Sequence, residues 1–196
     1  MTLPPTRRVL AHWDGDGVTV YQAFEPRIVR AAVEKGTFGV GFGRDRMTWI
    51  KPSFGWMLHR SGYAAKHGQE AVARVRLSHE GFRAILAQSV PTLYDLALFG
   101  READWQDALA RSEVRCQWDP DRDLHGRPLA RRAIQLGFRG VTVHRYVDEW
   151  ILSVEDVTEL ARAVGVAARS GSSLPDVPAE TEYPVDAEVA RILGYD

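Results

Sequence analysis

The stretch Arg46-Met-Thr-Trp-Ile-Lys-Pro-Ser-Phe-Gly-Trp-Met-Leu-His-Arg60 contains a strand pattern, a turn and the start of a helix in immediate succession. Residues 47–50 carry large and β-branched side chains, which predicts a short strand. Pro52 and Ser53 then begin a predicted helix over residues 54–60, because proline fits the first turn and a serine hydroxyl caps it. We expect the working surface of the protein to be built from this stretch.

Trp49 and Lys51 fall on the same face of the predicted strand, because side chains alternate along a strand. An aromatic ring beside a cation suits a nucleotide, since the ring stacks on the base and the ammonium meets the phosphate. A lysine stem packed over a tryptophan is an equally good interpretation, and a core role for Trp49 and Phe54 is a further alternative. Ser53 is expected to cap the helix, whose free N–H groups also form an anion site. Arg60 either joins that site or caps the far end of the helix.

The remaining elements follow from local patterns of hydrophobic residues, glycines and prolines. Strands are predicted where β-branched and aromatic residues gather, at residues 18–24, 71–77, 114–120, 141–143 and 150–154. Helices are predicted at residues 27–34, 80–88 and 156–164, and the amphipathic segment 91–115 is expected to be helical as well. Residues 132–137 fit either a helix or a strand. The glycine-rich segment 36–43 is expected to be a connector, because it lacks a phosphate-loop motif.

Strands and helices follow one another without a regular strand–helix–strand rhythm, which predicts an α+β fold and not a doubly wound parallel sheet. We expect one domain with a twisted, mostly antiparallel sheet flanked by helices. This domain is predicted over residues 18–168, after an N-terminal arm of residues 1–17. Residues 169–196 are expected to form a linker rich in proline, serine and glycine, followed by a short acidic helical tail.

Composition and charge limit the classes of protein to which the chain belongs. It has 196 residues, 45% of them hydrophobic, and a formal net charge of -1. This length supports a sizeable core, and the net charge excludes a general positive field that would attract nucleic acid or an anionic membrane. Residues 44–83 nevertheless contain eight Lys or Arg and three Asp or Glu, whereas residues 148–196 contain eleven acids and three bases. The basic segment is interpreted either as an anion-binding surface or as an ordinary mixed surface.

Cysteine and histidine usage bears on compartment and metal binding. Cys116 is the only cysteine in the sequence, so no disulfide forms within the chain, as is typical of a reducing compartment. The N-terminal residues lack a signal-peptide core, and no apolar run approaches the length of a membrane span. We therefore expect a cytoplasmic protein. The six histidines lack zinc-ligand spacing, and the alternating Asp119, Asp121 and Asp123 lack the glycine and glutamate of a calcium loop, so no metal site is expected.

Several unusual strings occur together in this sequence: Val20-Tyr-Gln-Ala-Phe24, Arg46-Met-Thr-Trp-Ile-Lys-Pro-Ser-Phe54, Gln117-Trp-Asp-Pro120 and Ala133-Ile-Gln-Leu-Gly-Phe-Arg-Gly140. On these strings the chain resembles the family catalogued as domain of unknown function 4291. The resemblance covers roughly residues 7–165, and the tail after Ser170 lies outside it. The family implies no particular activity, so a functional hypothesis has to come from the residues or from the architecture.

The order of the elements also resembles the architecture of ADP-ribosyltransferases, which build a split sheet around NAD. That family places a polar residue on the first strand, an aromatic or hydroxyl residue at a strand-to-helix junction, and a catalytic glutamate just before a late strand. On this plan Tyr21 and Gln22 lie on the first strand, and Glu149 takes the catalytic position. The junction residues are Thr48, Trp49 and Ser53. The chain departs from the family in having no Ser-Thr-Ser stretch, no His-Tyr pair, and two adjacent acids in place of Glu-x-Glu or Gln-x-Glu.

The architectural resemblance implies an NAD-dependent ADP-ribosyltransferase-like enzyme, with NAD as substrate and nucleic acid or protein as acceptor. Glu149 would stabilise the oxocarbenium-like transition state, Trp49 or Tyr21 would stack on the nicotinamide, and Arg46 and its neighbouring cations would neutralise the pyrophosphate. The alternative is a non-catalytic nucleotide- or RNA-binding module that uses the same Trp, Lys and Arg surface. A hydrolase or phosphotransferase acting on nucleotides is a third hypothesis.

Overall fold

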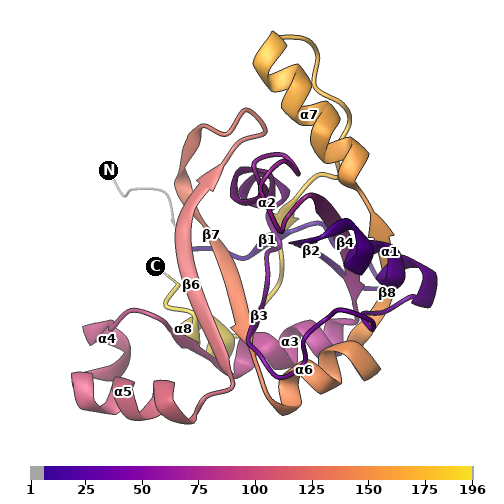
Figure 1. The fold of residues 1–196 in the computed structure, drawn as a ribbon. Coiled ribbons are helices and arrows are strands. Elements are labelled where there is room, and N and C mark those ends of the chain that lie inside the picture. Colours follow the sequence, from indigo (N-terminus) through magenta and orange to yellow (C-terminus); the bar gives the residue numbers. More distant parts are fainter. Residues whose placement is uncertain (1–6, 196) are drawn as a thin grey trace.

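Two sheets form the centre of the computed structural model, which describes residues 7–195 (Figure 1). The first sheet contains β2 (Val18–Phe24), β4 (Ala71–Leu77) and β8 (Ile151–Asp156), with β4 paired antiparallel to both neighbours. Strands β2 and β4 have the predicted bounds. Both strands contain β-branched residues, which favour strands, and valines from both are buried in the same core.

The second sheet has the strand order β3 (Thr48–Ile50), β7 (Pro128–Phe138), β6 (Val114–Arg122) and β5 (Ser89–Pro91). Its pairs are antiparallel except for β5 with β6, which run parallel. Residues 132–137, which fitted either a helix or a strand, belong to β7. The strand predicted over residues 114–120 is β6, which continues to Arg122 because the long β7 pairs with it along this length.

A single backbone bridge joins the two sheets at Tyr21 and Lys51. Tyr21 N–H donates to the carbonyl oxygen of Lys51 at 2.8 Å, and Lys51 N–H donates to that of Tyr21 at 3.1 Å. Strands β2 and β3 therefore touch at one point and diverge elsewhere, which splits the sheet. The predicted α+β class with mostly antiparallel strands is confirmed.

Helices surround the sheets and begin at recognisable signals. Helix α1 (Pro26–Lys35) packs against β4 and β8, and α2 (Phe54–Ser61) packs against β2 and β6. Helix α3 (His79–Ala87) begins at Ser78, whose hydroxyl accepts a hydrogen bond from Gly81 N–H, and it contacts the π-helix η1 (Tyr146–Trp150). The predicted helix near residue 156 is α7 (Thr158–Ser170), which starts two residues later and runs further than expected.

Two predictions of local structure were wrong. Residues 141–143 were predicted as a strand but form the start of α6 (Val141–Arg145), because the Glu113 carboxylate accepts hydrogen bonds from the N–H groups of Val141 and Thr142. The segment 91–115 is not one helix. It is divided into the end of β5, α4 (Leu96–Phe99) and α5 (Glu102–Arg111), with Gly100 in a positive-φ conformation between the two helices.

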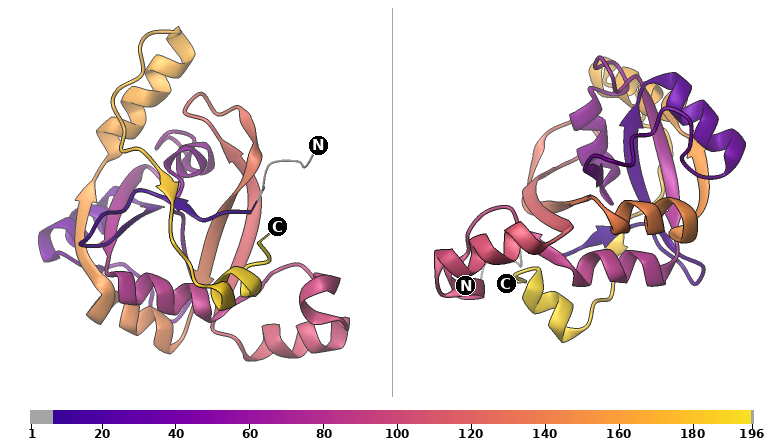
Figure 2. Two further views of the ribbon diagram at one scale, coloured as in Figure 1. Left: turned by 180° about the vertical axis from the view of Figure 1, so that it is seen from behind. Right: turned by 60° about the horizontal axis from the view of Figure 1, so that its bottom comes forward.

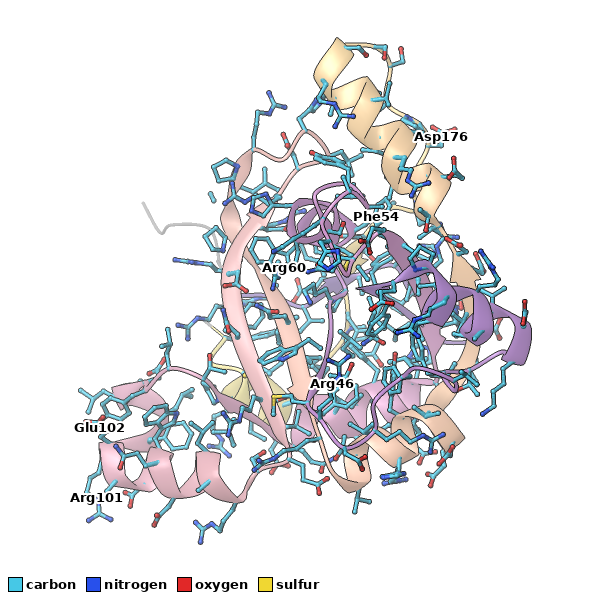
Figure 3. All side chains as sticks on the ribbon, in the orientation of Figure 1. Arg46, Phe54, Arg60, Arg101, Glu102 and Asp176 are labelled. Carbon is cyan, nitrogen blue, oxygen red and sulfur yellow. The ribbon has the colours of Figure 1, made fainter. Side chains whose placement is uncertain are left out.

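Helices α4 and α5 project from the body of the molecule and contain no buried residue (Figures 1 and 2). Figure 3 shows Arg101 and Glu102 on this projection, away from Arg46 and Arg60. No helix in the described part of the chain has the length and apolar character needed to cross a membrane.

The C-terminal segment returns to the body of the molecule, although residues 169–196 were expected to form a linker and tail. Figure 2 shows the chain running from α7 across the back of the molecule to α8 (Ala187–Ile192). On this path β9 (Thr181–Glu182) pairs with β1 (Leu10–Ala11), which lies in the predicted N-terminal arm. Tyr183 is only 1% exposed, because its ring packs against Trp13, His79 and Phe82. Residues 1–6 of the predicted arm lie outside the described residues.

Candidate functional site

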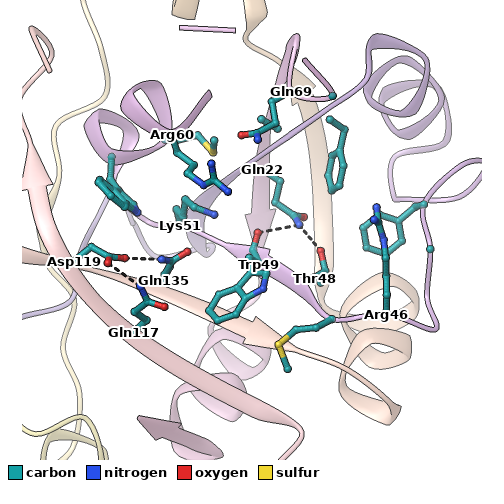
Figure 4. Close-up of a pocket in the computed structure, with 18 residues that line it drawn as sticks. Gln22, Arg46, Thr48, Trp49, Lys51, Arg60, Gln69, Gln117, Asp119 and Gln135 are labelled. Carbon is teal, nitrogen blue, oxygen red and sulfur yellow. Dashed lines mark hydrogen bonds between the residues drawn. The ribbon is translucent and has the colours of Figure 1, made fainter. Parts of the chain in front are cut away.

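A cleft of about 630 Å³ lies beside the single bridge between the two sheets (Figure 4). Strands β2, β3, β6 and β7, helix α2 and the glycine-rich connector all contribute to its walls. The lining side chains are mostly polar or aromatic, and the residues used below are Gln22, Arg46, Thr48, Trp49, Lys51, Trp56, Arg60, Gln69, Gln117, Asp119 and Gln135. The cleft therefore forms where β2 and β3 diverge.

Three cations line this cleft: Lys51, Arg60 and Arg46. Lys51 is only 6% exposed. Within residues 7–195, no carboxylate lies within ion-pair distance of any of the three, and their side chains make no hydrogen bond to protein (Figure 4). Such an arrangement is costly for a buried ammonium unless a ligand supplies the missing negative charge.

Burial and, to a smaller extent, the nearby Arg60 guanidinium lower the pKa of Lys51 from 10.5 to about 8. The negative charge of Asp119 acts in the opposite direction but does not compensate. The site therefore has a positive electrostatic potential at Lys51 and Arg60, because adding a second positive charge there is unfavourable. An anionic ligand would relieve this repulsion.

The local sequence explains why Lys51 points into the cleft. Its backbone continues β3 and forms the bridge to Tyr21, so its side chain lies on the same strand face as Trp49, as predicted. Helix α2 starts immediately afterwards and carries Arg60 in its last turn. Ser53 caps the helix, as predicted, by accepting a hydrogen bond from Trp56 N–H at 3.1 Å. A strand followed at once by a helix thus brings both cations to one wall.

Trp49 lies against Gly137 of β7, its pairing partner across the sheet. A Cβ atom at position 137 would lie 2.7 Å from the indole ring, which is too close for any ordinary contact. Glycine at this position therefore allows the ring to lie against the strand and still line the cleft. Trp56, the second tryptophan of the lining, stacks on His59 with 5.3 Å between ring centroids.

Asp119 is the single carboxylate among the described residues that line the cleft. Gln117 Nε2 donates to one of its oxygens at 2.8 Å, and Gln135 Nε2 donates to the other at 2.5 Å (Figure 4). Gln117 and Gln135 are direct partners in the β6–β7 register, so the pairing of the strands places both amides beside Asp119. We call these two glutamines and the carboxylate they hold the clamp. The two amides therefore hold the carboxylate in one orientation.

Gln22 fastens the two sheets together beside the cleft and is only 2% exposed. Its Nε2 donates to Thr48 Oγ1 at 2.8 Å and to the Trp49 carbonyl oxygen at 3.2 Å, while its Oε1 accepts from Tyr146 Oη at 2.6 Å. The amide of Gln22 is thus already engaged in protein contacts. It positions the β3 wall and leaves little capacity for a ligand.

Three residues predicted for the site do not line this cleft. Tyr21 packs on Phe54 in a core cluster, with 4.7 Å between ring centroids. Ser53 is buried, and its hydroxyl donates to Asp121 at 2.8 Å. Glu149 is exposed on η1, where its carboxylate pairs with Arg145 at 2.9 Å. The cleft is lined by the other predicted site residues, namely Gln22, Arg46, Thr48, Trp49, Lys51 and Arg60.

Neither Asp119 nor the two glutamines that hold it were assigned to the site from the sequence. Asp119 was considered only as one of three alternating acids, and Gln135 lies in a segment that fitted either a helix or a strand. The alternation of Gln117 and Asp119 on one strand is such a signal, because residues two apart face the same way. No group of His, Cys, Asp and Glu side chains in residues 7–195 is arranged to hold a metal ion.

The family comparison agrees with the sequence resemblance and extends it. Residues 8–183 match the family model described as Domain of unknown function (DUF4291). The match continues past α7 and includes β9 and Tyr183, although the tail after Ser170 was expected to lie outside the shared pattern. No protein in the curated comparison matches this sequence.

Proposed function

The chain belongs to the DUF4291 family, and from the geometry of its cleft we propose that it binds a nucleotide-type ligand with a phosphate on Lys51 and Arg60. The observation that carries this proposal is the group of cations without protein partners in a partly enclosed cleft. Phosphate groups match such sites because they bring charge and several acceptor oxygens. Arginine adds a rigid donor fork that suits two phosphate oxygens at once.

The rest of the cleft fits the remainder of a nucleotide. Trp49 and Trp56 provide aromatic surface of the kind on which bases stack. Gln69 lines the same cleft with an amide that makes no hydrogen bond through its side chain within the described residues. Figure 4 shows Arg46 beyond Thr48, on the other side of Trp49 from Lys51 and Arg60, so it provides a further cation for a second phosphate.

A thermal-shift panel with NAD, ATP, GTP and a short single-stranded RNA tests the proposal. A ligand that binds only the folded protein raises the melting temperature, and at 100 times Kd it contributes about 2.7 kcal/mol. Arg60→Ala is expected to weaken binding of the responding nucleotide roughly 10- to 100-fold, because a charge-assisted contact is lost. Arg83→Ala is the matched control, since Arg83 is exposed on α3 and outside the cleft.

Three results would contradict the proposal. If no nucleotide changes the melting temperature, the ligand is not a nucleotide. A shift with RNA alone that weakens with salt would favour the RNA-binding module, because phosphate contacts along a strand are screened by salt. Equal losses in Arg60→Ala and Arg83→Ala would mean that binding occurs outside the cleft.

NAD-dependent transfer of ADP-ribose is the second candidate function, and the split sheet supports it. The cleft lies between the two halves of the sheet, with Gln22 from the first strand and Thr48 and Trp49 from the strand-to-helix junction in its walls. Glu149 is outside the cleft, so the carboxylate available for this reaction is Asp119. In the reaction the bond from nicotinamide nitrogen to the ribose breaks, nicotinamide leaves with the electron pair, and an acceptor bonds to the ribose carbon and releases a proton. Asp119 would stabilise the positive charge that develops on the ribose.

Release of nicotinamide from NAD separates this candidate from simple binding. Asp119→Asn is expected to abolish release while the NAD-induced thermal shift remains, because the asparagine keeps the size but lacks the charge. Glu149→Gln should leave release unchanged, since Glu149 lies away from the cleft lining. Loss of release in Glu149→Gln with an active Asp119→Asn protein would reverse the assignment. An NAD shift without any release would leave only the binding function.

A further inference from the structure

Lys51 combines three properties that are rarely found together in a purely structural lysine. It is 6% exposed, its ammonium nitrogen makes no hydrogen bond or ion pair within residues 7–195, and it lines a cleft open to a ligand. Figure 4 shows its side chain pointing between Arg60 and the Gln135–Asp119 clamp. Buried lysines that serve only the fold are normally paired.

Burial and the neighbouring Arg60 increase the neutral fraction of the Lys51 amine, and the charge of Asp119 opposes them. Arg60 on α2 disfavours a second positive charge, and Asp119 on β6, the carboxylate that faces it, is already held by Gln117 and Gln135. The Asp119 carboxylate lies beyond ion-pair distance of the Lys51 nitrogen, so it does not hold that nitrogen in an ion pair. A neutral amine keeps a free electron pair and is the nucleophilic form of lysine.

We propose that Lys51 is a covalent site that forms an imine with a small aldehyde carrying a phosphate, with the phosphate held by Arg60. The amine nitrogen adds to the carbonyl carbon, and the two amine hydrogens leave with the carbonyl oxygen as water. A carbon–nitrogen double bond remains, and the step needs no oxidant or reductant. This inference goes beyond the proposed nucleotide binding but uses the same Arg60, so the two have to be tested separately.

The test uses pyridoxal phosphate as the aldehyde, reduction with sodium borohydride to fix the imine, and peptide mass spectrometry. The sequence is well suited to it because Lys35, Lys51 and Lys66 are its only lysines. Lys35 and Lys66 are exposed and serve as internal controls. At pH 7 a lysine with a pKa of about 8 has roughly three-hundred-fold more neutral amine than an ordinary lysine with a pKa of 10.5. Lys51 is therefore expected to be labelled first and at the lowest aldehyde concentration.

Variants and a second aldehyde identify the role of the phosphate. Arg60→Ala should reduce labelling of Lys51 at least ten-fold while Arg83→Ala leaves it unchanged, and pyridoxal without its phosphate should label Lys51 more weakly than pyridoxal phosphate. Labelling of Lys35 or Lys66 before Lys51 would overturn the proposal. So would equal labelling in Arg60→Ala, or equal labelling by the two aldehydes.

The adduct on Lys51 and the nucleotide-induced thermal shift are two separate measurements on the unsubstituted protein, so the two proposals can fail independently. Lys51→Arg is the control for the adduct alone, because arginine cannot form the imine. Labelling of Lys51 in a protein that binds no nucleotide would support the imine site and contradict the proposed function. A nucleotide-induced rise in the melting temperature with no adduct on Lys51 would support the proposed function and contradict the imine site.

Discussion

Lys51 occupies a position where a charged side chain lowers the stability of the folded protein. Its pKa is about 8 in the fold against 10.5 ordinarily, which corresponds to roughly 3 kcal/mol as an upper value. The penalty is fully present below pH 8, where the lysine is charged in both the folded and unfolded states. It is relieved as the pH rises from 8 to 10.5, because the folded protein then contains the neutral amine and the unfolded chain the charged one.

Lys51→Met is therefore expected to raise the free energy of unfolding at pH 7 by about 1–3 kcal/mol, since the shape is kept and the buried charge removed. The advantage should shrink as the pH approaches 10.5. Denaturant unfolding at several pH values measures this difference. Lys35→Met is the matched control, because Lys35 is exposed at the end of α1 and should show no such pH trend. A Lys51→Met protein less stable than the parent at pH 7 would show that the ammonium has a stabilising partner.

At the level of elements, the cleft depends on how β3 lies against β7. Thr48, Trp49 and Ile50 pair with Phe138, Gly137 and Leu136, and the indole of Trp49 occupies the space that a side chain at position 137 would need. Gln22 then fixes the other side of β3 through Thr48 and the Trp49 carbonyl group. The wall of the cleft is thus a short strand held between a glycine and a glutamine.

Gly137→Ala is expected to lower the free energy of unfolding by about 1–3 kcal/mol, because the added methyl group collides with the indole of Trp49. In a Trp49→Ala background the same change should have little effect, so a double-mutant cycle measured by denaturant unfolding isolates the contact. Gly15→Ala is the control, since a Cβ atom there meets nothing within 4 Å. Equal effects of Gly137→Ala with and without Trp49 would place the indole elsewhere.

At the scale of the whole molecule, the two ends of the chain close the back of the fold. Strand β9 pairs with β1, Tyr183 N–H donates to the Val9 carbonyl oxygen at 2.8 Å, and Trp118 Nε1 donates to the Leu193 carbonyl oxygen at 3.0 Å. Glu180 also reaches α2, where its carboxylate accepts a hydrogen bond from Phe54 N–H. The segment beyond α7 is therefore part of the structure that supports the cleft helix.

Tyr183→Ala is expected to destabilise the protein by about 3–5 kcal/mol, because a fully buried ring is removed from the core. Thermal and denaturant unfolding measure the loss. Tyr94→Ala is the control, since Tyr94 is 36% exposed on the projecting α4–α5 region and should cost much less. If the C-terminal segment were an independent tail, the two substitutions would have similar small effects.

Several features of this protein followed from its sequence alone, because they depend on neighbouring residues. The bounds of β2 follow from its β-branched and aromatic residues, and those of β4 from its alternation of polar and apolar residues. The start of α2 follows from Pro52 and the Ser53 cap. The grouping of Trp49 and Lys51 on one face follows from strand geometry. Membership of the family likewise followed from the strings around these elements.

Only the tertiary structure decided which distant groups share the cleft. Asp119 lines the cleft because the β6–β7 register places Gln117 opposite Gln135, and both hold its carboxylate. Glu149 lies outside the cleft, on η1, where its carboxylate binds Arg145. Tyr183 is buried in the core although the residues around it were predicted to form a linker. The physical reason is that local patterns select helices and strands, while register and long-range packing select the face that each side chain presents.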